Sequence, residues 1–544
     1  MNAIPPPVGL NQRQDADPPK QITRHVPGLG TLHGYVWPNG VQRFYGIPYG
    51  KFTKNWTRAT LVESWQDQTH DGTKLGPWAM QPVPWAYVSS HSSIPVQPYS
   101  YLNAPNENDN KNCLTMNLTL PPGTKAGSNN EVPIPAPVLI FIHVGAFVYG
   151  SSYFPAYDGY RLVSESLRKG KPVVYASFNY RLGLFGFLAS TDVRRQLKAD
   201  GFAGNSNFGL TDQQLALEWI RSYIPRFGGD KDNVTIFGES AGAMSVSAHL
   251  ASRKGKDLFH RAAQLSGGLG SFQSFTDEEF YEKLLREIKI PRDAEDRLER
   301  LQEIPDERLV AVTHKMFTTF ITVPSLCNDG WFFENPHSPF HLKPPPSWLK
   351  GFMAGETRDK GMIFRDEFWH ETPKTVRSRL RQHLDTDAVN HVESAYDITP
   401  EMTYSVKDRI LEDIAGDVMM RIPNIAIADT ATLKHCSVPI YLYHFDQRWL
   451  TAEERPVADA VHSAFVDFAY GLEPWEDYSV AKRWRIWGPD DKVRLVTEGE
   501  DEPERRYGRM RGLLSKEWYP KFFRFVEDVA IKRYRIFDGT GYVY

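Results

Sequence analysis

The chain has 544 residues, of which 41% are hydrophobic, 13% aromatic and 24% charged, a composition typical of folded globular proteins and unlike that of disordered or membrane chains. Its formal net charge is −3 at pH 7, which gives no long-range attraction for nucleic acid or for an anionic membrane. The length exceeds what one hydrophobic core usually supports, so we expect two domains or one large domain with long insertions.

The first residues differ in composition from the rest of the chain. Residues 1–25 are rich in Pro, Asn and Asp and predict a loose arm. Folded structure is expected from about Gly28, where TLHGYVWPNGVQRFYGIPYG predicts a hairpin that turns at Pro38-Asn39-Gly40. The amino terminus shows no secretory signal pattern, and the most apolar stretch is too short and interrupted to span a bilayer.

Strand-like and helix-like segments then alternate along the chain. Apolar runs at 138–145, 171–183 and 233–238 predict buried strands, and residues 210–227 and 241–252 have helical patterns. This alternation is typical of a mostly parallel sheet covered on both faces by helices. The charged region at about 270–420 predicts a helical insertion or lid, and SVPIYLYHFD, residues 437–446, predicts a late strand of the same sheet.

One motif carries chemistry. Gly238-Glu239-Ser240-Ala241-Gly242 is a G-x-S-x-G sequence between a predicted strand and a predicted small-residue helix, the context of a nucleophile elbow. The glycines leave room for a sharp turn, and Ser240 stands over a helix amino terminus that favours developing negative charge. A second segment, IHVGAF at 142–147, follows a buried strand and can supply backbone N–H donors for an oxyanion.

These motifs, with others in the same order, make the chain resemble the type-B carboxylesterase and lipase family, which includes cholinesterases, liver-type carboxylesterases and fungal lipases. The matching stretches run over roughly residues 28–480 and are FYGIPYG, NCLTMNL, NYRLGLFGFL, SNFGLTDQQLALEWI, FGGDKDNVTIFGESAGA and PVADAVHSAFVDFAYG. The tail from WRIWGPDD resembles fungal-type members. The resemblance implies an α/β-hydrolase fold, with a large, mostly parallel sheet flanked by helices, in a single catalytic domain over residues 26–544.

The resemblance also implies site residues. By position, Ser240 matches the family's nucleophile, and the family's oxyanion donors match the N–H groups of Gly145, Ala146 and Ala241. The family's loop reads His followed by three glycines, whereas this chain reads His143-Val144-Gly145-Ala146, so we expect an oxyanion hole of altered shape with a narrower acyl pocket. His462 stands nine residues before Gly471, where the family places its catalytic base.

The acid of the triad is the departure from the family pattern. The family places a glutamate directly before a glycine, and in the segment GETRDKG, residues 355–361, that position is Lys360. A lysine cannot accept a hydrogen bond from the histidine, and its charge would repel an imidazolium. Three explanations stay open. Asp359 reaches the histidine, another carboxylate such as Glu356 or Asp467 substitutes, or no acid is present.

Cysteine content bears on the compartment. The family usually pairs the cysteine of the NCLTMNL segment with one about thirty residues earlier, but Cys113 has no earlier partner in this chain. With Cys327 and Cys436, the chain has three cysteines, an odd number, and they show no CxxC spacing. A reducing, cytoplasmic location fits this pattern best.

Three functions compete on these grounds. The first is hydrolysis of a carboxylic ester through an acyl-enzyme, with no metal or organic cofactor; the aromatic residues Trp85, Tyr87, Phe147 and Tyr149 suggest a bulky apolar or aromatic ester. The second is a non-hydrolytic biosynthetic step on a fungal metabolite, an elimination, cyclisation or acyl transfer, motivated by Lys360. The third is a catalytically inactive binding protein, which the retained Ser240 disfavours.

Overall fold

A computed structural model gives the structure of the chain, and it describes residues 19–81, 108–123, 135–154, 157–268, 277–320, 326–333, 343–368, 371–447, 455–515 and 518–530. The main sheet of this described part has 13 strands in the order β1-β2-β3-β7-β9-β8-β10-β11-β12-β13-β14-β15, with β6 beside β2. Its strands are β1 (Lys20–Val26), β2 (Gly30–Val36), β3 (Gln42–Pro48), β6 (Thr69–Asp71), β7 (Thr115–Leu120), β8 (Ala136–Ile142), β9 (Val174–Phe178), β10 (Gly229–Glu239), β11 (Arg261–Leu265), β12 (Phe352–Thr357), β13 (Ile440–Phe445), β14 (Arg483–Trp487) and β15 (Val493–Thr497). A separate small pair consists of β4 (Gly50–Lys51) and β5 (Thr60–Leu61).

The centre of the sheet is parallel from β9 to β14, and antiparallel strands complete both edges. This confirms the predicted mostly parallel sheet. β9 and β10 lie on opposite sides of β8, so the chain order reverses around β8. In open α/β sheets, ligands bind outside the carboxyl ends of the strands at such a reversal, and this is where β8 and β10 end.

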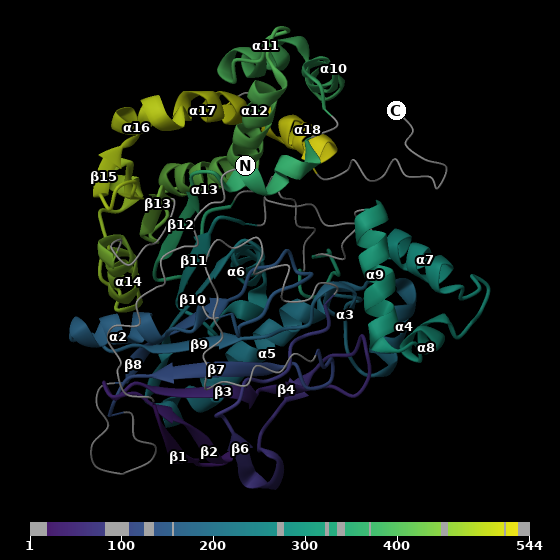
Figure 1. Cartoon of the computed structure of the whole chain (residues 1–544), viewed down its shortest axis with the longest axis vertical. Helices are drawn as coiled ribbons and strands as arrows, with labels where there is room; N and C mark the ends of the chain where they lie inside the picture. Colours follow the sequence, from purple (N-terminus) through teal and green to yellow (C-terminus); the bar gives the residue numbers. More distant parts are fainter. Residues whose placement is uncertain are drawn as a thin grey trace, which may run out of the picture.

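Helices cover both faces of the sheet (Figure 1). They are α2 (Tyr160–Arg168), α3 (Gly183–Phe187), α4 (Thr191–Ala199), α5 (Phe208–Tyr223), α6 (Ala241–Ala251), α7 (Asp277–Ile288), α8 (Arg297–Gln302), α9 (Asp306–Phe320), α10 (Pro373–His383), α11 (Thr386–Ala395), α12 (Tyr404–Gly416), α13 (Ile422–Leu433), α14 (Arg455–Ala469), α15 (Tyr478–Ala481), α16 (Glu498–Arg505), α17 (Tyr507–Ser515) and α18 (Tyr519–Ala530). Short helical turns are η1 (Gln66–Gln68), η3 (Ile224–Phe227), η4 (Arg253–Gly255), η6 (Lys360–Glu367) and the π-helical η7 (Asp417–Arg421).

Strand β8 shows how the sheet separates two cores. All seven of its residues are buried. Ile140 and Ile142 join one cluster with residues of α5 and α6, whereas Leu139 and Phe141 join a second cluster with residues of α2 and α14. Successive strand side chains point to opposite faces, so a run that is apolar on both faces is the pattern of a strand buried on both sides.

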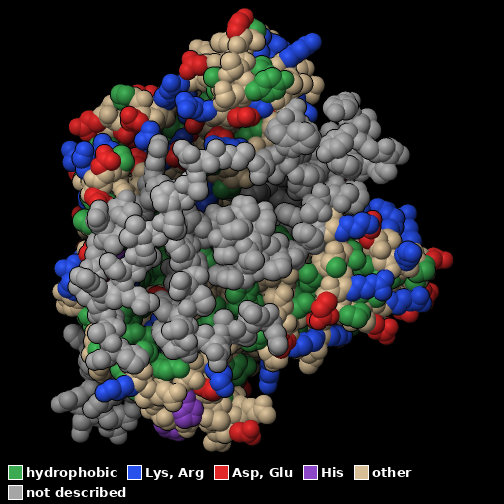
Figure 2. Space-filling view, viewed as in Figure 1, with side chains coloured by type: hydrophobic (Ala, Val, Ile, Leu, Met, Phe, Trp, Pro, Cys, Tyr) green, Lys and Arg blue, Asp and Glu red, His purple; other side chains and the backbone are tan. Residues whose placement is uncertain are grey.

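The predicted insertion at 270–420 is wrong as one continuous helical unit. Helices α7–α9 lie together at one side of the molecule, whereas α10–α12 lie near α16–α18 beyond the other end of the sheet (Figure 1). Between them, β12 enters the main sheet between β11 and β13. Only six residues form this strand, among long charged helices, so its β pattern is weak in the sequence. Figure 2 shows basic and acidic side chains interspersed on the lobe formed by α7–α9.

The amino-terminal boundary also differs from the prediction. The hairpin is confirmed, because β2 and β3 pair antiparallel and Gly40 has the positive φ of 83° that its turn requires. The predicted arm of residues 1–25, however, is too long. Lys20–Val26 form β1, which pairs antiparallel with β2 and buries Arg24 and Val26 while their neighbours stay exposed. This alternation is that of an edge strand.

No helix in the described residues is long and apolar enough to cross a membrane.

Candidate active site

Ser240 occupies the turn between β10 and α6. Its backbone angles, φ 56° and ψ −118°, lie outside the regions that non-glycine residues favour, and such strain amounts to about 1–3 kcal/mol. The Ser240 amide donates to the Leu265 carbonyl over 2.9 Å, and the Ser240 carbonyl accepts from Met244 in the first turn of α6. The residue is half-exposed. The predicted strand, turn and helix of a nucleophile elbow are therefore all present.

The two glycines of the elbow allow its backbone to pack closely. A Cβ on Gly238 would lie 2.5 Å from the backbone of Gly242, and a Cβ on Gly242 would overlap the Ile142 carbonyl at the end of β8. No side chain fits at either position. The first turn of α6 therefore rests directly on the strand that leads into the predicted oxyanion loop.

The loop after β8 has an unusual backbone. Gly145, Ala146 and Phe147 all have positive φ, at 120°, 53° and 62°. The Gly145 carbonyl accepts from the amides of Val148 and Tyr149, and the Phe147 carbonyl accepts from Gly183 over 2.6 Å. Among the described residues, the amides of Gly145, Ala146 and Ala241 have no backbone acceptor.

His143 lies between the end of β8 and the positive-φ residues of this loop. Its side chain is fully buried and stacks on Tyr180, with ring centroids 4.4 Å apart. Its Nδ1 lies 2.8 Å from the Val144 carbonyl, so this nitrogen carries the proton and donates. Burial lowers the pKa of His143 to about 4, and the ring is therefore neutral at pH 7.

The segment GETRDKG ends β12 and begins η6. Glu356 is 1% exposed. Its carboxylate binds His444 Nδ1, accepts from Asn424 Nδ2 over 3.1 Å and lies 3.7 Å from the Arg421 guanidinium. Burial alone would raise the pKa of Glu356, but His444 and Arg421 lower it overall. Glu356 is therefore an ionised anchor of the turn.

The two charges at the end of the segment point to different surroundings. The Lys360 ammonium forms an ion pair with Glu239, the residue before the nucleophile. Asp359 is exposed, and its carboxylate makes no hydrogen bond or ion pair with any described residue. The lysine therefore faces the elbow, and the aspartate faces solvent.

His462 lies in the middle of α14. One turn later, Phe465 packs on Phe237 of β10 at 5.1 Å between ring centroids. Burial lowers the pKa of His462, and the charges of Asp459 and Glu165 partly offset this effect. Asp459 lies on α14, Glu165 lies on α2, and Asp158 lies just before α2. The ring makes no hydrogen bond with Ser240 or any other described residue.

The structure does not assemble a triad from the residues that the sequence suggested. Asp359, Glu356 and Asp467 all lie in the described chain, and none contacts His462. Asp467 binds Lys169 and Lys171 at 2.8 and 2.7 Å instead. The acidic neighbour that the sequence analysis missed is Asp459, three residues before His462 and so on the same face of the helix.

A model of the carboxylesterase family matches residues 21–485. The chain belongs to the carboxylesterase family. Membership places it among the carboxylic ester hydrolases, which act on small-molecule esters, and confirms the resemblance. Lipase 3 of Yarrowia lipolytica (strain CLIB 122 / E 150) is 27% identical over 476 residues, which cover 83% of this chain and 89% of the lipase. Para-nitrobenzyl esterase of Bacillus subtilis (strain 168) is 29% identical over 447 residues, which cover 80% of each chain.

A third relative of this carboxylesterase-family chain carries a different description. It is the inactive carboxylesterase-like protein VdtD of Byssochlamys spectabilis, 25% identical over 479 residues, which cover 81% of this chain and 74% of VdtD. Among solved structures, a thermophilic PNB esterase superposes with a TM-score of 0.65 at 24% identity and covers 90% of this chain and 99% of its own. This likeness confirms the α/β-hydrolase fold.

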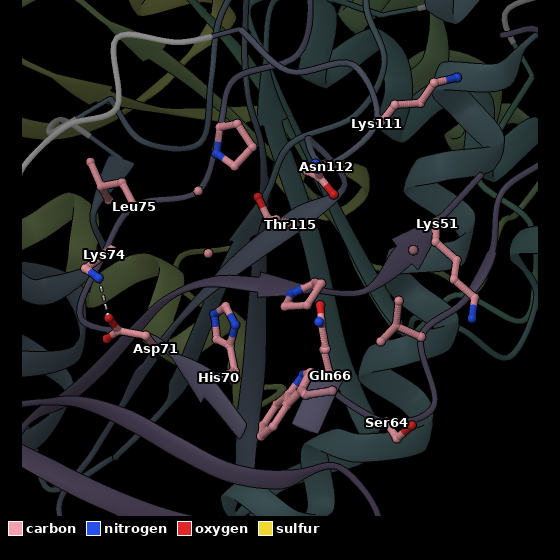
Figure 3. Close-up of a pocket in the computed structure, with 17 residues that line it drawn as sticks. Lys51, Ser64, Gln66, His70, Asp71, Lys74, Leu75, Lys111, Asn112 and Thr115 are labelled. Carbon is pink, nitrogen blue, oxygen red and sulfur yellow. Dashed lines mark ion pairs between the residues drawn. The ribbon is translucent and has the colours of Figure 1, made fainter. Parts of the chain in front are cut away.

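A cavity of about 440 Å³ lies elsewhere in this carboxylesterase-family fold. Figure 3 shows His70, Gln66, Asn112 and Thr115 around it, with Lys74 paired to Asp71 at its edge. No residue of the elbow, of the loop after β8 or of GETRDKG lines it, so it is separate from Ser240.

Several other features of the described chain bear on the expectations from the sequence. In the described chain, no group of three or more His, Cys, Asp and Glu side chains is arranged to hold a metal ion. Cys113, Cys327 and Cys436 form no disulfide with one another. Trp85 and Tyr87 lie outside the described residues. Phe147 is 1% exposed and packs on Phe187, so it is a core residue.

Proposed function

We propose that this carboxylesterase-family chain hydrolyses a carboxylic ester through an acyl-enzyme formed on Ser240. The observation that carries the proposal is the strained, half-exposed Ser240 at the end of β10, next to a loop with three successive positive-φ residues at the end of β8. Strain of this kind concentrates at functional sites. This strain supports Ser240 as the nucleophile, with N–H groups of the neighbouring loop as the proposed oxyanion donors.

In this mechanism, Ser240 Oγ attacks the ester carbonyl, and the N–H groups of Gly145, Ala146 and Ala241 stabilise the oxyanion. His462 takes the serine proton and returns it to the leaving alcohol. Water then attacks the acyl-enzyme, and the acid is released. Hydrogen bonds between base and nucleophile are often loose without substrate and tighten when it binds. We therefore assign the role of general base to His462.

We assign the acid that supports His462 to Asp459. Of the charges that act on the ring, Asp459 has the largest effect in favour of its protonated form. Asp359 is exposed, Glu356 is bound by His444 and Asp467 by two lysines. That the ester is bulky and apolar or aromatic stays a prediction. So does the cytoplasmic location, which is favoured because Cys113, Cys327 and Cys436 form no disulfide with one another.

A second candidate is a non-hydrolytic step on the same scaffold, such as an elimination, cyclisation or acyl transfer. The ion pair between Lys360 and Glu239 favours it, because a cation stands where the resemblance predicts the triad acid. The description of the relative VdtD as inactive favours it as well.

One experiment separates the two candidates. The protein is treated with a fluorophosphonate probe, the adduct is located by mass spectrometry, and turnover of a p-nitrophenyl acyl ester is measured in parallel. Hydrolysis requires a Ser240 adduct and turnover that Ser240→Ala abolishes. Labelling of Ser240 with negligible turnover would favour the second candidate, and absence of both would refute the proposal.

A further inference from the structure

Glu239 directly precedes the proposed nucleophile in the chain. Glu239 is the last residue of β10, and its side chain is 32% exposed. Its charge also reaches neighbouring side chains, since it adds to the effect of burial in raising the pKa of Tyr157 and of Tyr443. An unpaired anion at this place would oppose the second anion that forms on the ester carbonyl.

The size of this opposition follows from Coulomb's law. Two like charges up to about 10 Å apart, at an effective dielectric constant of about 20, repel by an amount that lowers a rate at least about 10-fold. The pairing of Glu239 is therefore expected to change the rate measurably.

Lys360 supplies the pairing charge. Its ammonium binds the Glu239 carboxylate, and its side chain is only 14% exposed. A lysine on a loose surface loop gains little from such a pair, because solvent screens the charges and the side chain loses entropy. This lysine is mostly buried, so its position depends on how firmly the GETRDKG segment is held.

The segment is fixed before Lys360 by backbone and side-chain contacts. Glu356 is held by His444 and Asn424. Thr357 then donates its amide to Ser266 Oγ over 3.1 Å, and Arg358 donates to the Phe445 carbonyl over 3.0 Å.

The segment is also fixed directly after Lys360. A Cβ on Gly361 would overlap the Glu412 carbonyl of α12, so the chain passes against α12 with no room for a side chain. With both flanks held, the Lys360 side chain starts from a defined place and has little freedom to leave Glu239.

We propose that Lys360 is a positioning residue of the esterase site, which neutralises Glu239 and so allows the oxyanion to form beside it. The inference rests on the function proposed above. It assigns a role to the lysine that replaces the expected triad acid. Lys360 acts through Glu239 and does not itself touch the ester.

A double-mutant cycle on p-nitrophenyl acetate hydrolysis tests this role. Lys360→Gln leaves Glu239 unpaired and is expected to lower kcat/KM at least about 10-fold. Lys360→Gln combined with Glu239→Gln removes both charges, and we expect at least a 5-fold recovery over Lys360→Gln alone. Glu239→Gln alone completes the cycle. A double variant no better than Lys360→Gln would overturn the inference, because a merely structural lysine is not rescued by removal of its partner.

A further measurement excludes a general structural effect. Lys360→Arg keeps the charge and is expected to retain kcat/KM within about 5-fold, and a loss equal to that of Lys360→Gln would contradict the inference.

A matched control removes a lysine–carboxylate pair far from the site. Lys521 on α18 binds Asp385 at 3.2 Å and is 54% exposed, and Lys521→Gln is expected to keep wild-type activity. Fluorophosphonate labelling distinguishes a failure of the proposed function from a failure of the role given to Lys360. If wild-type Ser240 is not labelled, the proposed function fails and this inference with it. If Ser240 is labelled but the cycle shows no recovery, only the role of Lys360 fails.

Discussion

Gly242→Ala tests whether close packing between α6 and β8 sets the geometry of the site. The new Cβ would lie 2.1 Å from the Ile142 carbonyl oxygen, whereas ordinary contacts begin at 3.4 Å. The start of α6 must therefore move by about 1.3 Å, and a displacement of about 1 Å at a reacting centre lowers rates by roughly 10²-fold. Helix propensity acts in the other direction, since alanine is favoured over glycine by about 1 kcal/mol inside a helix.

The assay is kcat/KM for p-nitrophenyl acetate, with urea unfolding in parallel. We expect a loss of roughly 10²-fold in a protein that remains folded. Gly499→Ala in α16 is the control, because nothing lies within 4 Å of its Cβ, and it should leave activity unchanged. If Gly242→Ala kept activity within about 3-fold of wild type, the backbone contact would not position the nucleophile.

Three other substitutions follow from the structure. Asp459→Asn removes a charge that supports the His462 imidazolium, so kcat should fall about 3- to 10-fold and the acid limb of the kcat/KM profile should move to lower pH; an unmoved limb would contradict the assignment. Glu356→Gln breaks a buried ion pair and should lower the free energy of unfolding by about 3–5 kcal/mol at pH 7. Because the pKa of Glu356 is lowered in the fold, the stability it contributes is present above the unfolded-state pKa and is lost as the pH falls through the folded-state pKa. The difference in free energy of unfolding between wild type and Glu356→Gln, measured in urea, should therefore be smaller at pH 4 than at pH 7. An equal difference at the two pH values would refute this. Gly361→Ala places a Cβ against a carbonyl of α12 and should lower both Tm and kcat/KM, whereas a wild-type Tm would argue against a fixed turn.

The sequence predicts best where the chemistry is local. The elbow around Ser240 needs only a strand, a tight turn and a helix in succession, and all three are contiguous. The run that forms β8 is apolar on both faces and so could be read as a buried strand. In contrast, β12 has six residues with a glycine among long helices, and only its neighbours β11 and β13 make it a strand of the sheet.

The acid position could not be read from the sequence because it depends on distant partners. Glu356, Asp359 and Lys360 are separated by four residues or fewer, yet one is bound in the core, one faces solvent and one meets Glu239. Packing against β13, α12 and α13 decides which of these three side chains is buried, which is exposed and which is paired with Glu239. The orientation of the His462 side chain depends likewise on the helix α14 that carries it. Sequence spacing alone determines neither the surroundings of the three charged side chains nor this orientation.

The proposed mechanism requires Ser240 to form a covalent acyl intermediate. Rapid mixing with p-nitrophenyl acetate, followed by acid quench and peptide mass spectrometry, detects this intermediate. We expect a burst of p-nitrophenol close to one equivalent per chain and an acetyl group on the peptide that contains Ser240, both absent in Ser240→Ala. Turnover without an acyl adduct, or an equal burst from Ser240→Ala, would contradict it.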